Sequence, residues 1–209
     1  MMNTCFIFGA GSLRDGDLRF EKKAGDMLIA ADAGYIPLMT DGITPDLIIG
    51  DFDSAAKPDF AGEVITLPVV KDDTDVGFAV KEGFRRGYAS FVIFGGLGGK
   101  RLSHTLANIQ LLSYVRSRGG NAELVCGGTR VFIIDGVVAF GPEQRGSLSL
   151  FALSDAAEVS IAGTDYDGER IALSRSFPLG VSNSFSGAGG RVEVLSGEVL
   201  AVVEEDVPH

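Results

Sequence analysis

Two acidic side chains separated by one residue follow an apolar run in the first third of the chain. Asp51 and Asp53 come directly after Gly50, where the apolar run ends. If the chain stays extended there, both carboxylates project to the same side. Two carboxylates this close repel each other unless a cation lies between them, and Mg²⁺ prefers such oxygen ligands. The pair therefore indicates a magnesium site, and the alternative is a turn in which both side chains accept hydrogen bonds from local backbone N–H groups.

A second acidic cluster occupies residues 71–75, which read Lys-Asp-Asp-Thr-Asp and open a helical pattern. Asp73 or Thr74 could cap that helix, and Asp75 could complement its dipole. Carboxylates, a lysine and helix N–H groups in one loop are also the components of a metal–phosphate site. Because two such clusters occur in one small region, we favour the metal–phosphate interpretation.

A glycine-rich loop with two following cations is the third motif. Residues 95–99 read Gly-Gly-Leu-Gly-Gly after an apolar run, and Lys100 and Arg101 precede a second helical pattern. Backbone that can approach a ligand closely, two cations and a helix start suit a polyphosphate. His104, in that helix, is one of only two histidines, so a histidine metal site or a Ser-His-Asp triad has little to build on.

Two familiar phosphate signatures are incomplete in this sequence. The loop at residues 9–14 carries Arg14 where a dinucleotide fingerprint needs its third glycine. Arg101 follows Lys100 where a Walker loop needs Ser or Thr to hold Mg²⁺. Neither a dinucleotide site nor a P-loop is expected.

Short apolar runs alternate with helical patterns as far as residue 127. Strands buried on both faces are expected at 4–8, 27–31, 46–49, 64–67, 90–94 and 122–126, and helices at 74–86 and 103–118. This alternation predicts a parallel, Rossmann-like α/β sheet, in which ligands bind at the carboxyl ends of the strands. All three motifs follow such strands.

The pattern changes after residue 127, where helical periods stop. Short strands are expected at 131–134, 137–140, 147–153, 158–162, 170–173, 191–195 and 200–203. Their even spacing predicts an all-β sandwich or barrel. Residues 1–127 carry 13 basic and 16 acidic side chains, against 5 and 12 in residues 128–209. We therefore expect two domains, 1–127 and 128–209, with the fold class of an α/β domain followed by an all-β sandwich.

Charge and hydropathy exclude several classes of partner. The 209 residues carry a net charge of −10, which argues against broad binding to nucleic acid or to an anionic membrane surface. No apolar run approaches the roughly 18 residues of a membrane span, and no basic segment resembling a signal peptide opens the chain. A cytoplasmic location is expected. Cys5 and Cys126 lie in apolar runs and are expected as buried thiols.

The three motifs, in this order and spacing, resemble those of thiamine pyrophosphokinases. Residues 31–34, Ala-Asp-Ala-Gly, resemble that family's early Ala-Asp-Gly-Gly element. Residues 180–185, Gly-Val-Ser-Asn-Ser-Phe, are similar to its late Gly-x-Ser-Asn-x-Phe element. The resemblance spans about residues 28–190.

The resemblance implies an ATP- and Mg²⁺-binding α/β domain followed by a thiamine-binding β-sandwich. It implies a homodimer whose active sites are shared between the N-terminal domain of one subunit and the C-terminal domain of the other. The implied reaction transfers the diphosphate of ATP to the hydroxyl of thiamine and gives thiamine diphosphate and AMP. The implied cofactor is Mg²⁺, and ATP is the implied co-substrate.

Site residues follow by position within the motifs. The implied metal ligands are Asp51, Asp53 and Asp75, with Asp72 or another of these catalytic carboxylates accepting the hydroxyl proton. The implied ATP and diphosphate contacts are Lys71, Thr74, Gly98, Gly99, Arg101, His104 and Asn108. The implied thiamine contacts are Ser103, Ser182 and Asn183.

Two positions depart from the family pattern. Ser103 stands where the family usually has Asp before the histidine of the third motif, and Ala33 replaces a glycine. A hydroxyl cannot supply the charge of a carboxylate, so two alternatives stay open. One is a pyrophosphokinase for another alcohol such as a hydroxymethylpterin, and the other is a thiamine- or nucleotide-binding protein that has lost turnover.

Overall fold

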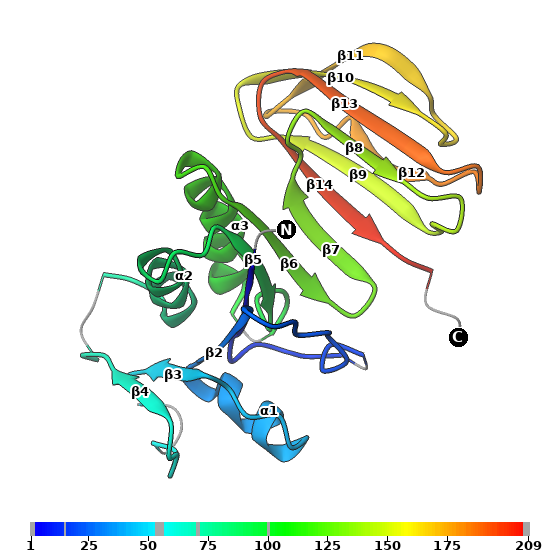
Figure 1. Cartoon of the computed structure of the whole chain (residues 1–209). Coiled ribbons are helices and arrows are strands. Elements are labelled where there is room, and N and C mark those ends of the chain that lie inside the picture. The colour runs from blue at the N-terminus through cyan, green and yellow to red at the C-terminus, as the bar shows by residue number, and fades with distance from the viewer. Residues whose placement is uncertain (1–2, 15, 53–56, 70–71, 100, 207–209) are drawn as a thin grey trace. The chain divides into compact units, whose positions relative to one another are not determined.

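The computed structural model describes residues 3–14, 16–52, 57–69, 72–99 and 101–206. The chain divides into two compact units, Met1–Gly127 and Gly128–His209 (Figure 1). The N-terminal unit contains helices and a parallel sheet, whereas the described part of the C-terminal unit contains strands without a helix. The mixed α/β class predicted from the sequence is confirmed. Within the described residues, no helix combines the length and the apolar character that a membrane crossing requires.

Six parallel strands form the sheet of the N-terminal unit. They are β1 (Thr4–Phe8), β2 (Met27–Ala31), β3 (Leu47–Gly50), β4 (Glu63–Thr66), β5 (Ser90–Phe94) and β6 (Asn121–Cys126). Their order is β6-β5-β1-β2-β3-β4, so β1 has β2 on one side and β5 on the other. Each strand lies within one residue of its predicted bounds. A run buried on both faces is a strong pattern, and β1, β2 and β3 are such runs, but the expectation is wrong for the edge strand β4, which has no buried residue.

Helices cover both faces of this sheet. On one face, Phe8 and Phe94 belong to an apolar cluster with Leu38 of α1 (Tyr35–Thr40). On the other face, α2 (Asp75–Arg85) packs against β1, β2 and β3, and α3 (Leu102–Ser117) packs against β6 and α2 (Figure 1). The helices α2 and α3 match the predicted periods to within one residue. The 3₁₀ turn η1 (Asp32–Gly34) and α1 were not predicted, since six residues including Pro37 are too short to show a helical period.

The C-terminal unit consists of two antiparallel sheets. Its strands are β7 (Thr129–Ile133), β8 (Val137–Phe140), β9 (Ser147–Ala152), β10 (Ala156–Ala162), β11 (Gly168–Ser174), β12 (Gly180–Ser184), β13 (Gly190–Ser196) and β14 (Val199–Glu204). One sheet has the order β12-β9-β14-β7 and the other β11-β10-β13-β8. Buried residues of both sheets, among them Leu150, Val159, Val192 and Ala201, form one apolar core.

Strand β12 was not predicted, although the other seven strands of this unit were. Its sequence, Gly-Val-Ser-Asn-Ser, contains one aliphatic side chain, Val181, so no apolar alternation marks it. It lies at the edge of its sheet, pairs only with β9 among the described strands, and shifts register between Gly180 and Asn183. Ser182, inside this irregularity, has a φ of 58°, in the left-handed region that favours glycine.

Candidate functional site

Two glycine loops meet at the carboxyl ends of β1 and β5, where the order of strands in the sheet reverses. The backbone N–H of Gly9 donates to the carbonyl of Phe94 at 2.9 Å, and that of Gly11 donates to the carbonyl of Gly95 at 3.1 Å. A Cβ on Gly11 would lie 2.2 Å from the Gly95 oxygen, so no other residue fits there. In open α/β sheets, ligands bind in the crevice at such a reversal point.

The loop at residues 95–99 is fastened to α3. Asn108 is 6% exposed, and its Nδ2 donates to the carbonyl of Gly96 at 2.8 Å. Thr105 Oγ1 donates to the carbonyl of Gly98 at 3.3 Å. Gly98 and Gly99 have φ values of 69° and 88°, so the chain turns here in a conformation that other residues rarely adopt. The structure thus gives Asn108, which the family resemblance makes an ATP contact, a bond that positions the loop.

The first turn of α3 exposes polar and cationic side chains. Arg101, Ser103 and His104 are all exposed, and Arg101 Nη1 lies 3.5 Å from His104 Nε2. The side chain of the N-cap residue Arg101 makes no capping hydrogen bond to α3. The first backbone N–H groups of a helix carry a partial positive charge, so this turn and Arg101 provide an electropositive point in an acidic protein.

The start of α2 is a capped helix N-terminus. Thr74 Oγ1 accepts a hydrogen bond from the backbone N–H of Gly77 at 3.0 Å, which is the capping alternative considered for this cluster. Asp73, just before α2, forms an ion pair with Lys81, which lies eight residues further along the chain. The hydrogen bond between them raises the pKa of Lys81. Asp72 is exposed and Asp75, the first helical residue, is half-buried. The hydroxyl proton of Thr74 stays available for donation, because the cap uses the oxygen as an acceptor.

Helix α2 begins beside the glycine loops. A Cβ on Gly9 would lie 3.0 Å from Cγ2 of Val76, the second residue of α2. A Cβ on Gly50, at the end of β3, would lie 3.0 Å from the Cα of Asp32, directly after β2. The polar segments after β1, β2, β3 and β5 and the start of α2 therefore gather at one edge of the sheet.

The backbone around the first acidic pair differs from the extended conformation that we expected. Asp51 follows β3 and is half-buried, but Phe52 has a φ of 56°, so the strand does not continue through it. Asp53 and Lys71 lie outside the described residues. Among the residues that are described, no group of three His, Cys, Asp or Glu side chains comes together as metal ligands. Asp51 and Asp75 offer carboxylate oxygens, which is the donor chemistry that suits Mg²⁺.

The late motif lies on β12 in the C-terminal unit, and its two polar side chains differ. Ser182 is exposed, and its backbone N–H donates to Ser149 Oγ at 3.0 Å. Asn183 is 8% exposed, and its Nδ2 donates to Thr164 Oγ1 at 2.8 Å and to the carbonyl of Tyr166 at 3.0 Å. Its Oδ1 accepts from the backbone N–H of Tyr166 at 2.9 Å.

The amide of Asn183 therefore holds the turn at residues 164–167, whereas the two serines of β12, Ser182 and Ser184, are exposed. At that turn Tyr166 is 74% exposed. The sequence analysis did not select Tyr166, because a tyrosine between two aspartates reads as a solvated loop. A pocket of about 110 Å³ in the same unit is lined by residues 150–152 and 173–179, none of which was predicted for the site.

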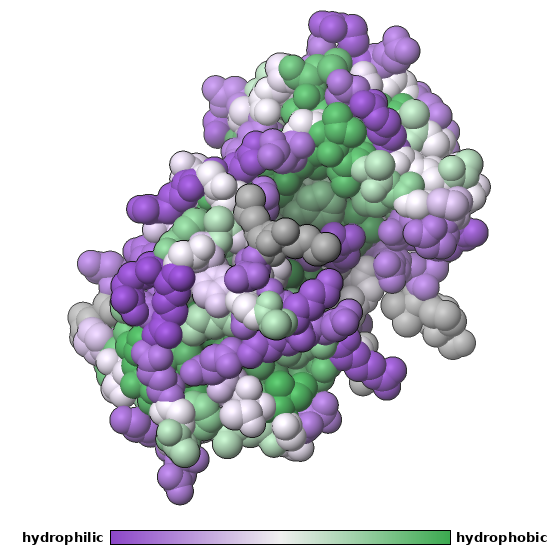
Figure 2. Space-filling model, viewed as in Figure 1, coloured by the Kyte–Doolittle hydropathy of each residue, from purple (hydrophilic) through white to green (hydrophobic). Residues whose placement is uncertain are grey.

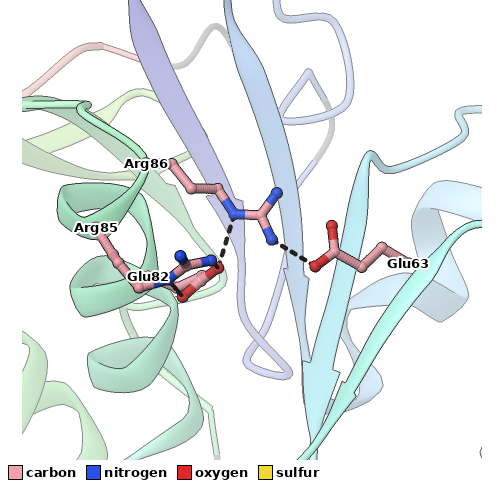
Figure 3. Close-up of polar contacts among 4 residues, drawn as sticks. All are labelled: Glu63, Glu82, Arg85 and Arg86. Atoms are coloured by element: carbon pink, nitrogen blue, oxygen red, sulfur yellow. Dashed lines mark hydrogen bonds and ion pairs between the residues drawn. The ribbon is translucent and has the colours of Figure 1, made fainter.

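An ion cluster lies at the opposite end of α2 (Figure 3). Glu82 accepts hydrogen bonds from Arg85 at 2.7 and 2.6 Å and from Arg86 Nε at 2.7 Å, and Arg86 Nη2 donates to Glu63 at 2.6 Å. The hydrogen bonds from Arg85, together with the one from Arg86, lower the pKa of Glu82 to about 2. Because Glu63 is the first residue of β4, this cluster joins α2 to the amino end of an edge strand, away from the glycine loops.

The two thiols differ in burial. Cys5 is fully buried, and burial raises the pKa of its thiol to about 12. Cys126 is half-buried, so the prediction of a buried thiol is wrong for this residue. Its Sγ lies 3.8 Å from the carbonyl oxygen of Ser12 in the loop after β1. The apolar run alone did not indicate this partial exposure, because Cys126 is the last residue of β6 and lies at the end of the strand.

These features define an α/β protein with acidic and glycine-rich loops at the reversal point of its parallel sheet, joined to an all-β unit. Residues 20–124 match the family model described as thiamin pyrophosphokinase, catalytic domain. The chain belongs to the thiamine pyrophosphokinase family. No sequence among curated proteins matches it.

Several solved structures with this fold carry the same family name in their descriptions. The crystal structure of thiamine pyrophosphokinase from Bacillus subtilis has a TM-score of 0.86 and 21% identity and covers 98% of this chain and 100% of its own. The enzyme of that name from Geobacillus thermodenitrificans has a TM-score of 0.81 and 23% identity, covering 97% and 98%. Thiamin pyrophosphokinase from Candida albicans gives 0.78 and 18%, covering 98% and 90%. Because the sequence identities are below 25%, these similarities show that the fold is shared.

Proposed function

We propose that this protein is a thiamine pyrophosphokinase that transfers the diphosphate of ATP to the hydroxyl of thiamine and releases AMP. The observation that supports this most directly is the convergence at one sheet edge of the interlocked glycine loops, the capped start of α2 and Asp51 after β3. In a chain of this family, that edge offers backbone N–H groups, carboxylates and cations together. Diphosphoryl transfer needs charge neutralisation and in-line positioning more than covalent catalysis.

Each part of the edge has a task in this reaction. Asp51 and Asp75, with Asp53, would hold Mg²⁺, which supplies neutralisation of the phosphate charge when bound. The loop at residues 95–99, held by Asn108, brings backbone close to the phosphates. Arg101 suits bidentate contact with a phosphate group.

Proton transfer falls to an exposed carboxylate. Asp72 is exposed at the start of the acidic loop and could accept the proton of the attacking hydroxyl. Lys71 and His104 would add donors to the ATP phosphates, as the family resemblance implies. Thr74 can donate its hydroxyl proton while it caps α2.

Thiamine recognition is assigned to Ser103 and to the late motif. On β12, Ser182 and Ser184 are both exposed; the family resemblance assigns the thiamine contact to Ser182, and Asn183 would act through the turn that it holds. The family resemblance supports a homodimer that shares its active sites between subunits. Phe177, Leu179 and Val181, exposed by 66%, 59% and 46%, support a partner surface on the C-terminal unit. On the one face of the molecule that Figure 2 shows, apolar residues lie among hydrophilic ones. A cytoplasmic location stays a prediction of the sequence.

The test is AMP release from purified protein with ATP, Mg²⁺ and thiamine, beside a reaction without thiamine. We expect AMP that depends on thiamine. Asp51→Asn should abolish this Mg²⁺-dependent turnover while the far-ultraviolet circular dichroism stays that of the parent chain. Near-normal turnover in the folded variant would remove Asp51 from the metal site.

Ser103→Asp distinguishes the two alternatives. Ser103 is exposed in the first turn of α3, so an aspartate fits there without repacking. Activity only in Ser103→Asp would identify the natural chain as a binding protein that has lost turnover. If neither the parent chain nor Ser103→Asp releases AMP with thiamine, but AMP is released with a hydroxymethylpterin, the acceptor alcohol is a different one.

A further inference from the structure

Asp17 is a buried carboxylate that the proposed reaction does not use. It is 3% exposed and follows the loop after β1. Its Oδ2 accepts a hydrogen bond from the backbone N–H of Arg14 at 2.7 Å, and its Oδ1 accepts one from the backbone N–H of Gly127 at 2.6 Å. Both bonds have a charged acceptor, which makes them stronger than bonds between neutral groups. Asp17 therefore ties the loop after β1 to Gly127.

Gly127 is the last residue of the N-terminal unit. Its φ is 58°, and a Cβ there would lie 3.1 Å from Cδ of Arg14, so the Arg14 side chain covers it. The next residue, Gly128, begins the C-terminal unit, and its carbonyl accepts a hydrogen bond from the N–H of Glu205 at 2.9 Å. The peptide that connects the two units is thus anchored once within each unit.

The loop tied by Asp17 also forms part of the candidate site. It begins with Gly9 and Gly11, which bond to Phe94 and Gly95, and Ser12 lies against Cys126. At its start this segment therefore bonds to Phe94 and Gly95, where the loop at residues 95–99 begins, and through Asp17 it bonds to Gly127, the last residue of the N-terminal unit. A change of conformation at residues 95–99 has a short, hydrogen-bonded route to Gly127.

We propose that Asp17 is a positioning residue that couples the glycine loops of the candidate site to the connection between the two units. This inference rests on the proposed function, because it links the unit that would bind ATP with the unit that carries the thiamine contact Ser182. Asp17 touches no substrate and acts through the N–H of Gly127. Filling of the phosphate site then restricts the conformations open to the connecting peptide.

Asp26 provides a matched control for Asp17. Its Oδ2 accepts from the backbone N–H of Lys23 at 2.8 Å and its Oδ1 accepts from that of Thr4 at 2.7 Å. Asp26 thus has the same pattern as Asp17: one hydrogen bond to the residue three positions earlier and one to a residue distant in sequence, here Thr4 at the amino end of β1. Asp17→Asn and Asp26→Asn each place an amide NH₂ against one of two N–H donors, so both remove a comparable local restraint.

The first measurement is hydrogen exchange at the Gly127 amide, with and without Mg²⁺ and ATP and with no thiamine present. In Asp17→Asn we expect exchange at Gly127 to accelerate by about tenfold or more, as loss of a bond to a charged acceptor implies. ATP should slow this exchange in the parent chain and in Asp26→Asn, but not in Asp17→Asn. Gly127→Ala should behave like Asp17→Asn, because a side chain at a φ of 58° is strained and weakens the hydrogen bond from the Gly127 N–H to Asp17.

The second measurement separates coupling from simple destabilisation. In Asp17→Asn we expect the KM for thiamine to rise severalfold while the KM for ATP stays within about twofold, and in Asp26→Asn the ratio of the two KM values should not change. Equal ratios in both variants, or Gly127 exchange as slow in Asp17→Asn as in the parent chain, would overturn the coupling. A parent chain without thiamine-dependent AMP would refute the proposed function instead, and the exchange measurement would still decide the role of Asp17.

Discussion

Replacing Glu82 by Gln should destabilise the N-terminal unit in a way that depends on pH. The Glu82 side chain is 6% exposed and accepts three hydrogen bonds, two from Arg85 and one from Arg86 (Figure 3). These hydrogen bonds lower the pKa of Glu82 from 4.5 to about 2, and Arg85 makes the largest contribution. Because the folded-state pKa lies below the unfolded one, the stabilisation is complete above about pH 4.5 and is lost as the pH falls through 2.

The magnitude follows from the two pKa values. A difference between 4.5 and about 2 corresponds to an upper limit of about 3 kcal/mol of unfolding free energy. Arg85 is 69% exposed, so solvent screens part of its charge. We therefore expect Glu82→Gln to lower the unfolding free energy at pH 7 by about 2 kcal/mol.

Urea unfolding followed by tyrosine fluorescence suits this measurement, because the chain has no tryptophan. Three of its four tyrosines, Tyr35, Tyr88 and Tyr114, belong to the N-terminal unit. The parent chain and Glu82→Gln should differ most at pH 7 and converge as the pH approaches 2, where the native carboxyl takes up its proton.

Glu193→Gln is the control for this experiment. Glu193 pairs with Arg191 at 2.7 Å, but both side chains are exposed, so its loss should cost less than about 1 kcal/mol. A difference between Glu82→Gln and the parent chain that is the same at pH 7 and pH 3 would refute the reasoning, because the effect would then not come from the charge of Glu82.

The remaining predictions concern the cap, the glycine loop and the thiols. Thr74→Ala should lower the unfolding free energy by about 1 kcal/mol through loss of the α2 cap, whereas Thr74→Ser should retain it, as urea unfolding will show. Asn108→Ala leaves the Gly96 carbonyl without its buried donor, so it should cost about 1 to 3 kcal/mol and raise the KM for ATP in the AMP-release assay; an unchanged KM would contradict the positioning of the loop. At pH 8, iodoacetamide should alkylate Cys126 and spare the native Cys5, whose pKa is about 12; equal rates by mass spectrometry would contradict its burial.

The strands and the two long helices of the N-terminal unit, α2 and α3, were predictable because apolar runs or a helical period mark them. The same reasoning failed at β12, where edge pairing with β9 and not side-chain burial makes the strand. It also failed at η1 and α1, which follow β2 and are too short to show a period. Local patterns therefore predict elements that bury a face, and they miss elements that depend on a distant partner.

The residue types of the candidate site could be named from the sequence, whereas the hydrogen-bond partners of these residues could not. Asn108 and Asn183 read as ligand contacts, yet each uses its amide to hold a loop, Asn108 at Gly96 and Asn183 at Tyr166. Phe52 reads as part of an extended strand, yet its φ is 56°. These outcomes depend on which backbone groups lie near each side chain, and that is set by tertiary contacts that a linear pattern does not contain.

The position of β1 between β2 and β5 has a consequence for the order in which the protein is built. Between the end of β1 at Phe8 and the start of β5 at Ser90, the described part of the chain forms β2, η1, α1, β3, β4 and α2. A nascent chain released as far as Gly87 already contains every acidic loop of the site, but it lacks the strand whose glycine loop closes against Gly11. Since pairing of distant segments must wait for its second partner, the two glycine loops can meet only after β1, β2, β3, β4 and β5 have all been made.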